Sequence, residues 1–144
     1  MDKFAFRDLR VYQNSKQLAI SICQLLKHFP SEENFALNSQ LRRAVFSVPS
    51  NFAEGMGRVS KKERVHFIEI AYGSLMEVLC QLEIAVALEY LSIEIFNDTE
   101  QQIIIIAKQL SRLKSSILSH EHLNGIDCPD PSKTLNSQLS TLDS

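Results

Sequence analysis

The sequence is poor in the two residues that mark the turns of β-rich folds. Its 144 residues include only four glycines and four prolines. Sandwiches and barrels join many short strands through turns that use these residues, so their scarcity argues against both architectures. The one β-branched run, "IIIIA" at 103–107, falls within a helical period. The composition therefore favours an all-α fold.

Cysteines are also few. Cys23, Cys80 and Cys128 are an odd number without a CxxC pair, which argues against a disulfide framework and against a zinc knuckle. Cys23 and Cys80 fall within helical patterns, where we expect small buried hydrophobic residues. His120 and His122 are two residues apart, a spacing that does not suit zinc. We expect no metal and no cofactor.

Long apolar runs are missing as well. No stretch has the length and uninterrupted apolar character that a membrane-spanning helix needs. The first ten residues, "MDKFAFRDLR", lack the apolar core of a signal peptide. We therefore expect a cytoplasmic protein with no membrane contact.

Charge of neither sign dominates, but its distribution is uneven. Lysines and arginines number 15 against 17 aspartates and glutamates, a net charge of −2. Residues 121–144 carry four acidic residues and one lysine, or −3, which leaves +1 for residues 1–120. The last segment also lacks apolar periodicity. We predict one bundle domain over residues 1–120 and a flexible, polar, acidic tail over 121–144.

Apolar residues recur three and four positions apart in four segments, which predicts four helices. The expected boundaries are about Asp8 to Phe29, Asn38 to Gly55, Ser60 to Tyr90, and Asp98 to Ser119. Four helices of similar length with short connections predict an antiparallel up-down four-helix bundle.

Local signals support several of these ends. Pro30 disfavours helical geometry in the residue before it, and Asn38 is a good N-cap residue. Gly55 and Gly57 supply a helix stop, and Ser60 with Glu63 forms a capping box.

A proline falls inside the second predicted helix. The apolar period continues from Leu41 through Val48 to Phe52 across Pro49. Proline removes one backbone donor and crowds the carbonyl four residues earlier, so we predict a kink in one continuous helix.

Two predicted helices carry more apolar side chains than one bundle core needs. Ile103 to Ile106 are consecutive and therefore point in four directions around the helix axis. Met76, Cys80, Ile84 and Ala87 lie away from the main apolar stripe of the third helix. Because exposed apolar surface of this kind usually marks a partner surface, we predict self-association into a closed oligomer.

A polar face accompanies the second helix. A helical projection groups Arg43, Ser47, Asn51 and Glu54, and the third helix offers Glu77. We predict that these five residues form a structural polar network between helices or between subunits. The alternative is an enzyme with Glu54 and Glu77 as general acid and base. No nucleophile or histidine accompanies them, so we expect no enzyme.

Basic residues gather in the same stretch of sequence. Residues 34–64 contain six basic residues and only two acidic ones, Glu54 and Glu63, which gives this stretch a net charge of +4. Repeated by symmetry, such a patch could bind phosphates; the alternative is a solvated surface. The candidate nucleic-acid-binding residues are Arg42, Arg43, Arg58, Lys61, Lys62 and Arg64.

Three stretches together resemble one known family. "FRDLRVYQ", "LNSQLRRAVFSVPSNFAEGMGRVSKKE" and "FIEIAYGSLMEVLCQLEIA" are similar to the signature of the four helix bundle protein family. Its members include proteins encoded by intervening sequences of large-subunit ribosomal RNA genes. The likeness covers residues 4 to about 118, and the ordered combination of "QLRRA", "SNFAEG" and "GSLMEV" is its most specific part.

The resemblance implies a four-helix bundle and a homopentamer with a central channel. It does not imply an enzyme, because the molecular role of the family is largely undefined. It extends to accessory proteins of diversity-generating retroelements, which are basic pentamers that bind nucleic acid and a reverse transcriptase; this chain is slightly acidic instead. Two functions follow as expectations. The first is an oligomeric scaffold or adaptor that engages RNA, DNA or a nucleic-acid-processing protein. The second is a purely protein-binding or structural oligomer without nucleic-acid contact.

Overall fold

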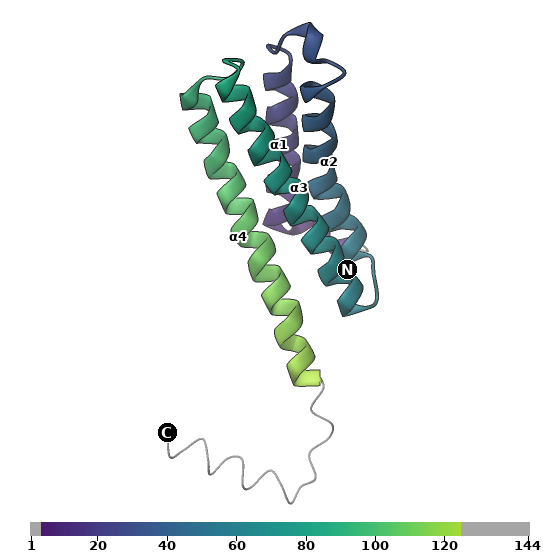
Figure 1. Ribbon diagram of the computed structural model, residues 1–144. Coiled ribbons are helices and arrows are strands. Elements are labelled where there is room, and N and C mark those ends of the chain that lie inside the picture. The colour runs from purple at the N-terminus through teal and green to yellow at the C-terminus, as the bar shows by residue number, and fades with distance from the viewer. Residues whose placement is uncertain (1–3, 125–144) are drawn as a thin grey trace, which may run out of the picture.

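The structure is a computed structural model that describes residues 4–124. Its four α-helices are α1 (Arg10–Leu26), α2 (Leu37–Met56), α3 (Lys61–Ala87) and α4 (Ile93–Asn124), and no strand occurs in that range. Short 3-10 helices at Ala5–Asp8 (η1) and Ser31–Glu33 (η2) precede α1 and α2. The helices lie side by side and alternate in direction, and α4 continues past the ends of the others (Figure 1). The predicted all-α four-helix bundle is confirmed.

All four helices contribute to one apolar core. The residues that are completely enclosed include Leu18 and Ile22 of α1, Leu41 and Phe52 of α2, Leu75 and Leu82 of α3, and Ile106 and Leu110 of α4. They recur at the spacing of three and four residues that the sequence shows, so each helix buries one stripe. Burial of this stripe is the main force that holds the bundle together.

The second helix begins differently from the prediction. Asn38 is not its N-cap: the cap residue is Ala36, and Asn38 is the second helical residue, buried, with its Nδ2 donating to Asn34 Oδ1 at 2.9 Å. The Glu33 carboxylate accepts instead from the Leu37 amide at 3.4 Å. The prediction was wrong because the carboxylate of Glu33, four residues before Leu37, accepts the first amide of the helix in place of the Asn38 side chain.

Helix α2 runs through Pro49 without interruption, so the predicted continuity is confirmed. Gly55, however, is not a stop. It is a buried residue inside the helix, where an added Cβ would lie 2.7 Å from the Cβ of Phe67 on α3. Gly57 does cap the helix, but with a φ of −81°, not in the left-handed conformation. Gly55 therefore serves close helix packing, whereas the sequence suggested helix termination.

Serine side chains accept hydrogen bonds from first-turn amides of the two longest helices, α3 and α4. Ser60 Oγ accepts from the Glu63 amide at 3.3 Å, which confirms the predicted cap of α3. Ser92 Oγ accepts from the Ile95 amide at 3.3 Å, so α4 begins at Ile93, five residues before the predicted start at Asp98. Helix α4 also extends to Asn124, past the predicted domain boundary at residue 120. The predicted tail from 125 onward lies outside the described residues.

The turn between α3 and α4 holds an unusual backbone. Glu89 adopts a φ of +63°, the only non-glycine residue in the left-handed region among those described. The Tyr90 amide donates back to the Ala85 carbonyl at 2.9 Å, which satisfies an otherwise unpaired carbonyl at the end of α3. This closing turn is usually made by glycine, because a side chain costs free energy in the left-handed conformation.

The sequence led us to expect no membrane-spanning segment, yet α3 is long and apolar enough for one by length and composition. An 18-residue window of this helix has a mean hydropathy of 1.4, with 28% of it buried. The core helix of a bundle can meet the same criterion. On its side toward α2, α3 carries Ser74, Glu77 and Gln81, and all three side chains form hydrogen bonds.

Candidate interaction surfaces

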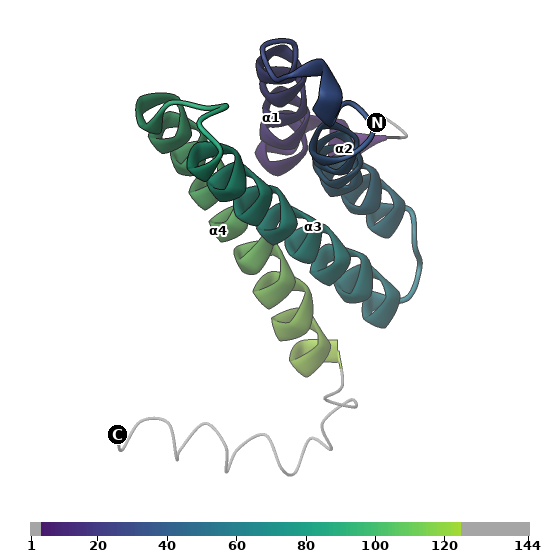
Figure 2. The same cartoon turned by 45° about the horizontal axis from the view of Figure 1, so that its top comes forward.

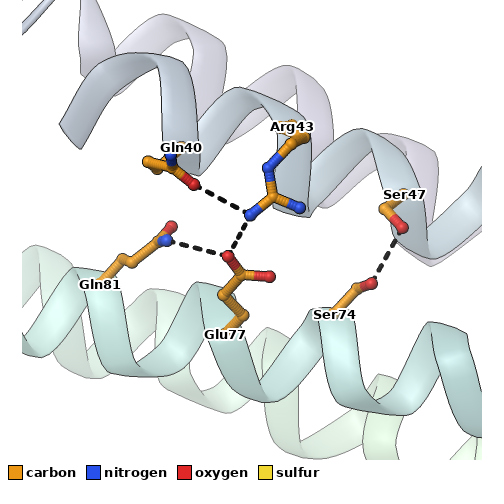
Figure 3. A network of polar contacts seen from close by, with 6 residues as sticks. All are labelled: Gln40, Arg43, Ser47, Ser74, Glu77 and Gln81. Carbon is orange, nitrogen blue, oxygen red and sulfur yellow. Dashed lines mark hydrogen bonds and ion pairs between the residues drawn. The ribbon is translucent and has the colours of Figure 1, made fainter. Parts of the chain in front are cut away.

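A polar seam joins α2 to α3, and its first half is built around an ion pair (Figure 3). The Arg43 guanidinium pairs with Glu77 Oε1 and also donates to Gln40 Oε1 at 2.9 Å. Gln81 Nε2 donates to the same Glu77 oxygen at 3.2 Å. The pair is more than one-third exposed on both sides, so its contribution to stability is small and its main effect is to set the register of the two helices.

The second half of the seam is made of hydroxyl and amide groups. Ser47 Oγ and Ser74 Oγ lie 2.9 Å apart across the helices. Asn51 Nδ2 donates to the Ser47 carbonyl at 2.8 Å and to its Oγ at 2.7 Å. The structure thus brings together four members of the predicted network, Arg43 with Glu77 and Ser47 with Asn51, in two separate groups.

Glu54 lies outside this seam. Its carboxylate pairs with Arg58 on the same stretch of chain, at 3.0 Å, and both side chains are exposed. Glu77 faces Arg43, which is eleven residues before Glu54 on α2. At 1.5 Å per residue, this places the two carboxylates about 16 Å apart along the helix. The structure therefore does not bring Glu54 and Glu77 together as an acid–base pair.

The six basic candidates divide into two groups. Arg42 and Arg43 lie in the first half of α2, whereas Arg58, Lys61, Lys62 and Arg64 surround the α2–α3 turn. The part of α2 from Arg43 to Met56 separates the groups by about 20 Å, so the predicted cluster around one junction is wrong in this respect. Arg43 faces Glu77 of α3, well past the start of that helix, whereas the Arg42 guanidinium lies 4.0 Å from Cys23 Sγ of α1.

Part of the positive charge at the α2–α3 turn is not paired with a carboxylate of the described residues. Arg58 pairs with Glu54 and lies over the Phe67 ring, 5.0 Å from its centroid. Arg64 Nε donates to the Arg58 carbonyl at 2.6 Å, and Arg64 forms no ion pair with a carboxylate of the described residues. Among the described residues, neither Lys61 nor Lys62 forms an ion pair.

Sequence reasoning missed two further arginines. Arg10, the first residue of α1, and Arg112 of α4 line one shallow hollow of about 310 Å³. Apolar Leu9, Val11 and Leu113 line the rest of it together with Gln109. These arginines are far apart in the chain, so only the packing of α1 against α4 could reveal that they share a surface.

The outer flank of α3 and α4, the side of this helix pair that carries Tyr72, Met76, Cys80 and Ile104, holds the excess of apolar side chains. Ile103 and Ile106 are buried, whereas Ile104 and Ile105 are 36% and 50% exposed. The prediction that the four isoleucines cannot all face the core is confirmed. Cys80 is exposed, so its predicted burial is wrong, and Cys23 is half-buried.

A hollow of about 240 Å³ lies at one end of this outer flank. Ile68 and Tyr72 of α3 line it together with Leu110 and Ser111 of α4. Lys114 and Glu69 form an ion pair of 2.8 Å at its edge. The hydrogen bond and positive charge from Lys114 hold the pKa of the Glu69 carboxyl below its ordinary value.

Among the described residues, no group of three or more histidine, cysteine, aspartate or glutamate side chains is placed to hold a metal. The side chains of His120 and His122 and all of Cys128 lie outside the described part of the chain. What the structure does display is two kinds of surface, one basic and one apolar.

Comparison with known families agrees with the resemblance seen in the sequence. Residues 7–112 match the family described as 23S rRNA-intervening sequence protein. The chain belongs to this family. Its fold is similar to the crystal structure of a protein of unknown function from the S23 ribosomal protein family of Bacteroides thetaiotaomicron. The two share 24% sequence identity with a TM-score of 0.68, over 73% of this chain and 95% of the other. No curated protein matches this family member.

Proposed function

We propose that this intervening sequence protein is a non-enzymatic, self-associating scaffold or adaptor in the cytoplasm, with the outer flank of α3 and α4 as a subunit contact. The apolar excess on that flank carries the proposal. Ile104, Cys80 and Tyr72 are exposed on this flank, and Tyr72 also lines the hollow, which could receive an apolar side chain from a second subunit. An engineered apolar cavity of about 150 Å³ can hold a benzene ring, so a hollow of this size is large enough.

Burial of this flank would stabilise an oligomer without any change in the bundle. Covering a large apolar side chain contributes about 1.5–3 kcal/mol when burial is complete. A patch on one side of each subunit can be covered by a different face of the next, and such contacts close into a ring when the rotation allows it. The number of five subunits comes from the family resemblance alone.

The mass in solution tests this proposal. Five chains of 16.4 kDa would give about 82 kDa by light scattering across several concentrations. Ile104→Glu should reduce the mass, because it places a charge within the apolar contact. Ile20→Glu on the exposed side of α1 is the matched control and should leave the mass unchanged. A stable monomer at micromolar concentration would refute the assembly, whereas a dimer or tetramer would refute only the number five.

A second proposed activity is contact with RNA or DNA through the α2–α3 turn. Lys61, Lys62 and Arg64 carry positive charge without an acidic partner among the described residues, which favours phosphate binding over a neutralised surface. A ring of subunits would repeat this charge and strengthen its attraction for a polyanion.

Salt-dependent retention on immobilised RNA tests this contact. Each phosphate-contacting lysine that is removed should lower the dependence of binding on log salt by about one unit, so a Lys61→Ala and Lys62→Ala double variant should lower it by about two. A double variant of Lys27 and Lys108, both exposed and away from the turn, removes the same charge and is the control. Equal loss in both double variants, or no retention of the unmodified protein, would favour the purely protein-binding alternative.

A further inference from the structure

One end of the bundle combines exposed apolar side chains with a large excess of negative charge. This end is formed by the α1–α2 connector and the α3–α4 turn, which Figure 2 brings toward the viewer. Side chains tie the two segments together: the Tyr90 hydroxyl donates to Glu33 Oε1 at 3.1 Å, and the Tyr90 and Phe29 rings lie 5.7 Å apart. The end is therefore one continuous part of the molecule.

Large apolar side chains at this end point away from the core. Phe35 in the connector is 99% exposed and Ile93 at the start of α4 is 52% exposed. Leu88 and Ile95 are exposed to a similar degree as Ile93. The same turn buries other residues, Leu91 and Phe96, so the core here is already complete without the exposed ones. Apolar surface in excess of the core usually marks a partner site.

The charge around these side chains is strongly negative. Residues 83–100 contain five acidic residues and no lysine, arginine or histidine. The connector adds Glu32 and Glu33 against Lys27, so the seven carboxylates and one lysine of this end give −6. The described chain as a whole carries 13 residues of each sign, which leaves +6 for the rest of the bundle. The near-neutral total conceals a separation of charge along the long axis.

We propose that this acidic apolar end, defined by Phe35, Leu88, Ile93 and Ile95 with the carboxylates between them, docks a basic amphipathic segment of another protein. Lysine or arginine side chains of the segment would meet the carboxylates, and its apolar side chains would cover Ile93 and its neighbours. Nucleic acid is repelled by a surface of this charge. The site goes beyond the proposed scaffold, because it lies at the end of the bundle, about three turns of α4 before Ile104, and does not use the α2–α3 turn.

A second copy of this chain is a weaker fit than a separate partner. Its basic regions with an exposed apolar residue are the α2–α3 turn, where Val59 stands beside Lys61, and the start of α1, where Leu9 stands beside Arg10. Both lie toward the opposite end of the bundle, because α1 begins on the side where α2 ends (Figure 1). Pairing opposite ends would stack subunits head to tail along one axis, and such contacts grow into open filaments, not closed oligomers.

The test uses the full chain and a defined probe. The probe is a fluorescent 18-residue peptide of leucine and lysine in a helical amphipathic pattern, and its counterpart carries glutamate in place of lysine. Fluorescence anisotropy should show binding of the lysine peptide that weakens as salt rises, and none of the glutamate peptide. Equal binding of the two peptides would overturn the proposal.

Matched variants locate the site. Ile93→Ser should weaken binding about tenfold, the factor that corresponds to partial loss of one apolar contact, and Glu94→Gln about twofold to threefold. Ile20→Ser is the control, because Ile20 is also an isoleucine with 52% exposure but lies on α1. Asp8→Asn removes one exposed negative charge at the other end. Both controls should bind as the unmodified chain does, and equal losses in all four variants would overturn the proposal.

Glu89→Gly separates binding from stability. Glycine relieves the left-handed backbone at this position, so the melting temperature should rise while affinity for the lysine peptide falls with the lost charge. Opposite shifts cannot come from partial unfolding. Light scattering on Ile93→Ser completes the test: an unchanged mass supports a separate docking site, and a reduced mass would show that Ile93 belongs to the subunit interface and would overturn the proposal.

Discussion

Two glycines in the long helices should respond in opposite ways to the same substitution. Gly55 in α2 and Gly73 in α3 are both helical. Replacement of glycine by alanine inside a helix normally stabilises a protein by about 0.5–1 kcal/mol, since alanine loses less backbone entropy on folding. A new Cβ at position 73 meets no atom within 4 Å, so Gly73→Ala should realise this gain.

The close packing of α2 on α3 reverses the sign at Gly55. There the new Cβ would lie 2.7 Å from Phe67 Cβ and 3.4 Å from the Arg64 carbonyl oxygen. Neither atom is the end of a flexible side chain, so the two helices must move apart. Overpacking of this kind costs about 1–3 kcal/mol. After the helix gain is subtracted, Gly55→Ala should destabilise the protein by about 0–2.5 kcal/mol, with a midpoint of about 1.3 kcal/mol.

Thermal unfolding of both variants at one protein concentration measures the difference. About 4 °C per kcal/mol is appropriate for a chain of this size, so the two melting temperatures should differ by about 8 °C. The concentration must be held constant because association also shifts the transition. A rise in melting temperature for Gly55→Ala would refute the argument that this glycine is needed for helix contact.

Substitutions at three further sites test local contacts. Ser60→Ala removes the hydroxyl that caps α3 and should cost about 1 kcal/mol in chemical denaturation, whereas Ser60→Asp should retain most of the stability. Glu54→Gln breaks only an exposed ion pair with Arg58 and should change stability by less than about 1 kcal/mol; a larger loss would return Glu54 to a structural network. Glu33→Gln should lower the pKa of Tyr90, which the Glu33 carboxylate raises by accepting a hydrogen bond from its hydroxyl. That bond contributes stability below the ordinary tyrosine pKa, and the contribution is lost as pH rises through the raised pKa of Tyr90. Because the variant lacks the carboxylate, its tyrosinate absorbance should appear at lower pH.

The polar and capping residues show how far local sequence signals reach. Ser60 caps α3 as predicted, because an N-cap depends on groups only two or three residues away. Asn38 carries the same type of signal, but Glu33 accepts the Leu37 amide in its place. Glu54 shares a helix face with Ser47 and Asn51, yet its partner is Arg58. A shared face is visible in the sequence, whereas the choice between competing partners depends on where side chains end in space.

The basic residues show that closeness in sequence does not predict closeness in the folded bundle. Six of them are close in sequence, but the length of α2 divides them into two groups. Arg10 and Arg112 are distant in sequence, but the packing of α1 and α4 brings them to one hollow. Along one helix, each residue of sequence separation adds 1.5 Å of distance. Between packed helices, residues far apart in sequence can lie side by side.

The amino-acid sequence by itself determined the helical class, the four apolar stripes and the surplus of isoleucines, because helix formation and burial follow from a period of 3.6 residues. Only the tertiary structure decided that Gly55 is a packing site, that Ile104 and Ile105 are the exposed pair, and that charge is separated between the two ends of the bundle. These features depend on which helix faces which, and that choice is made by the fit of whole surfaces, not by any local run of residues.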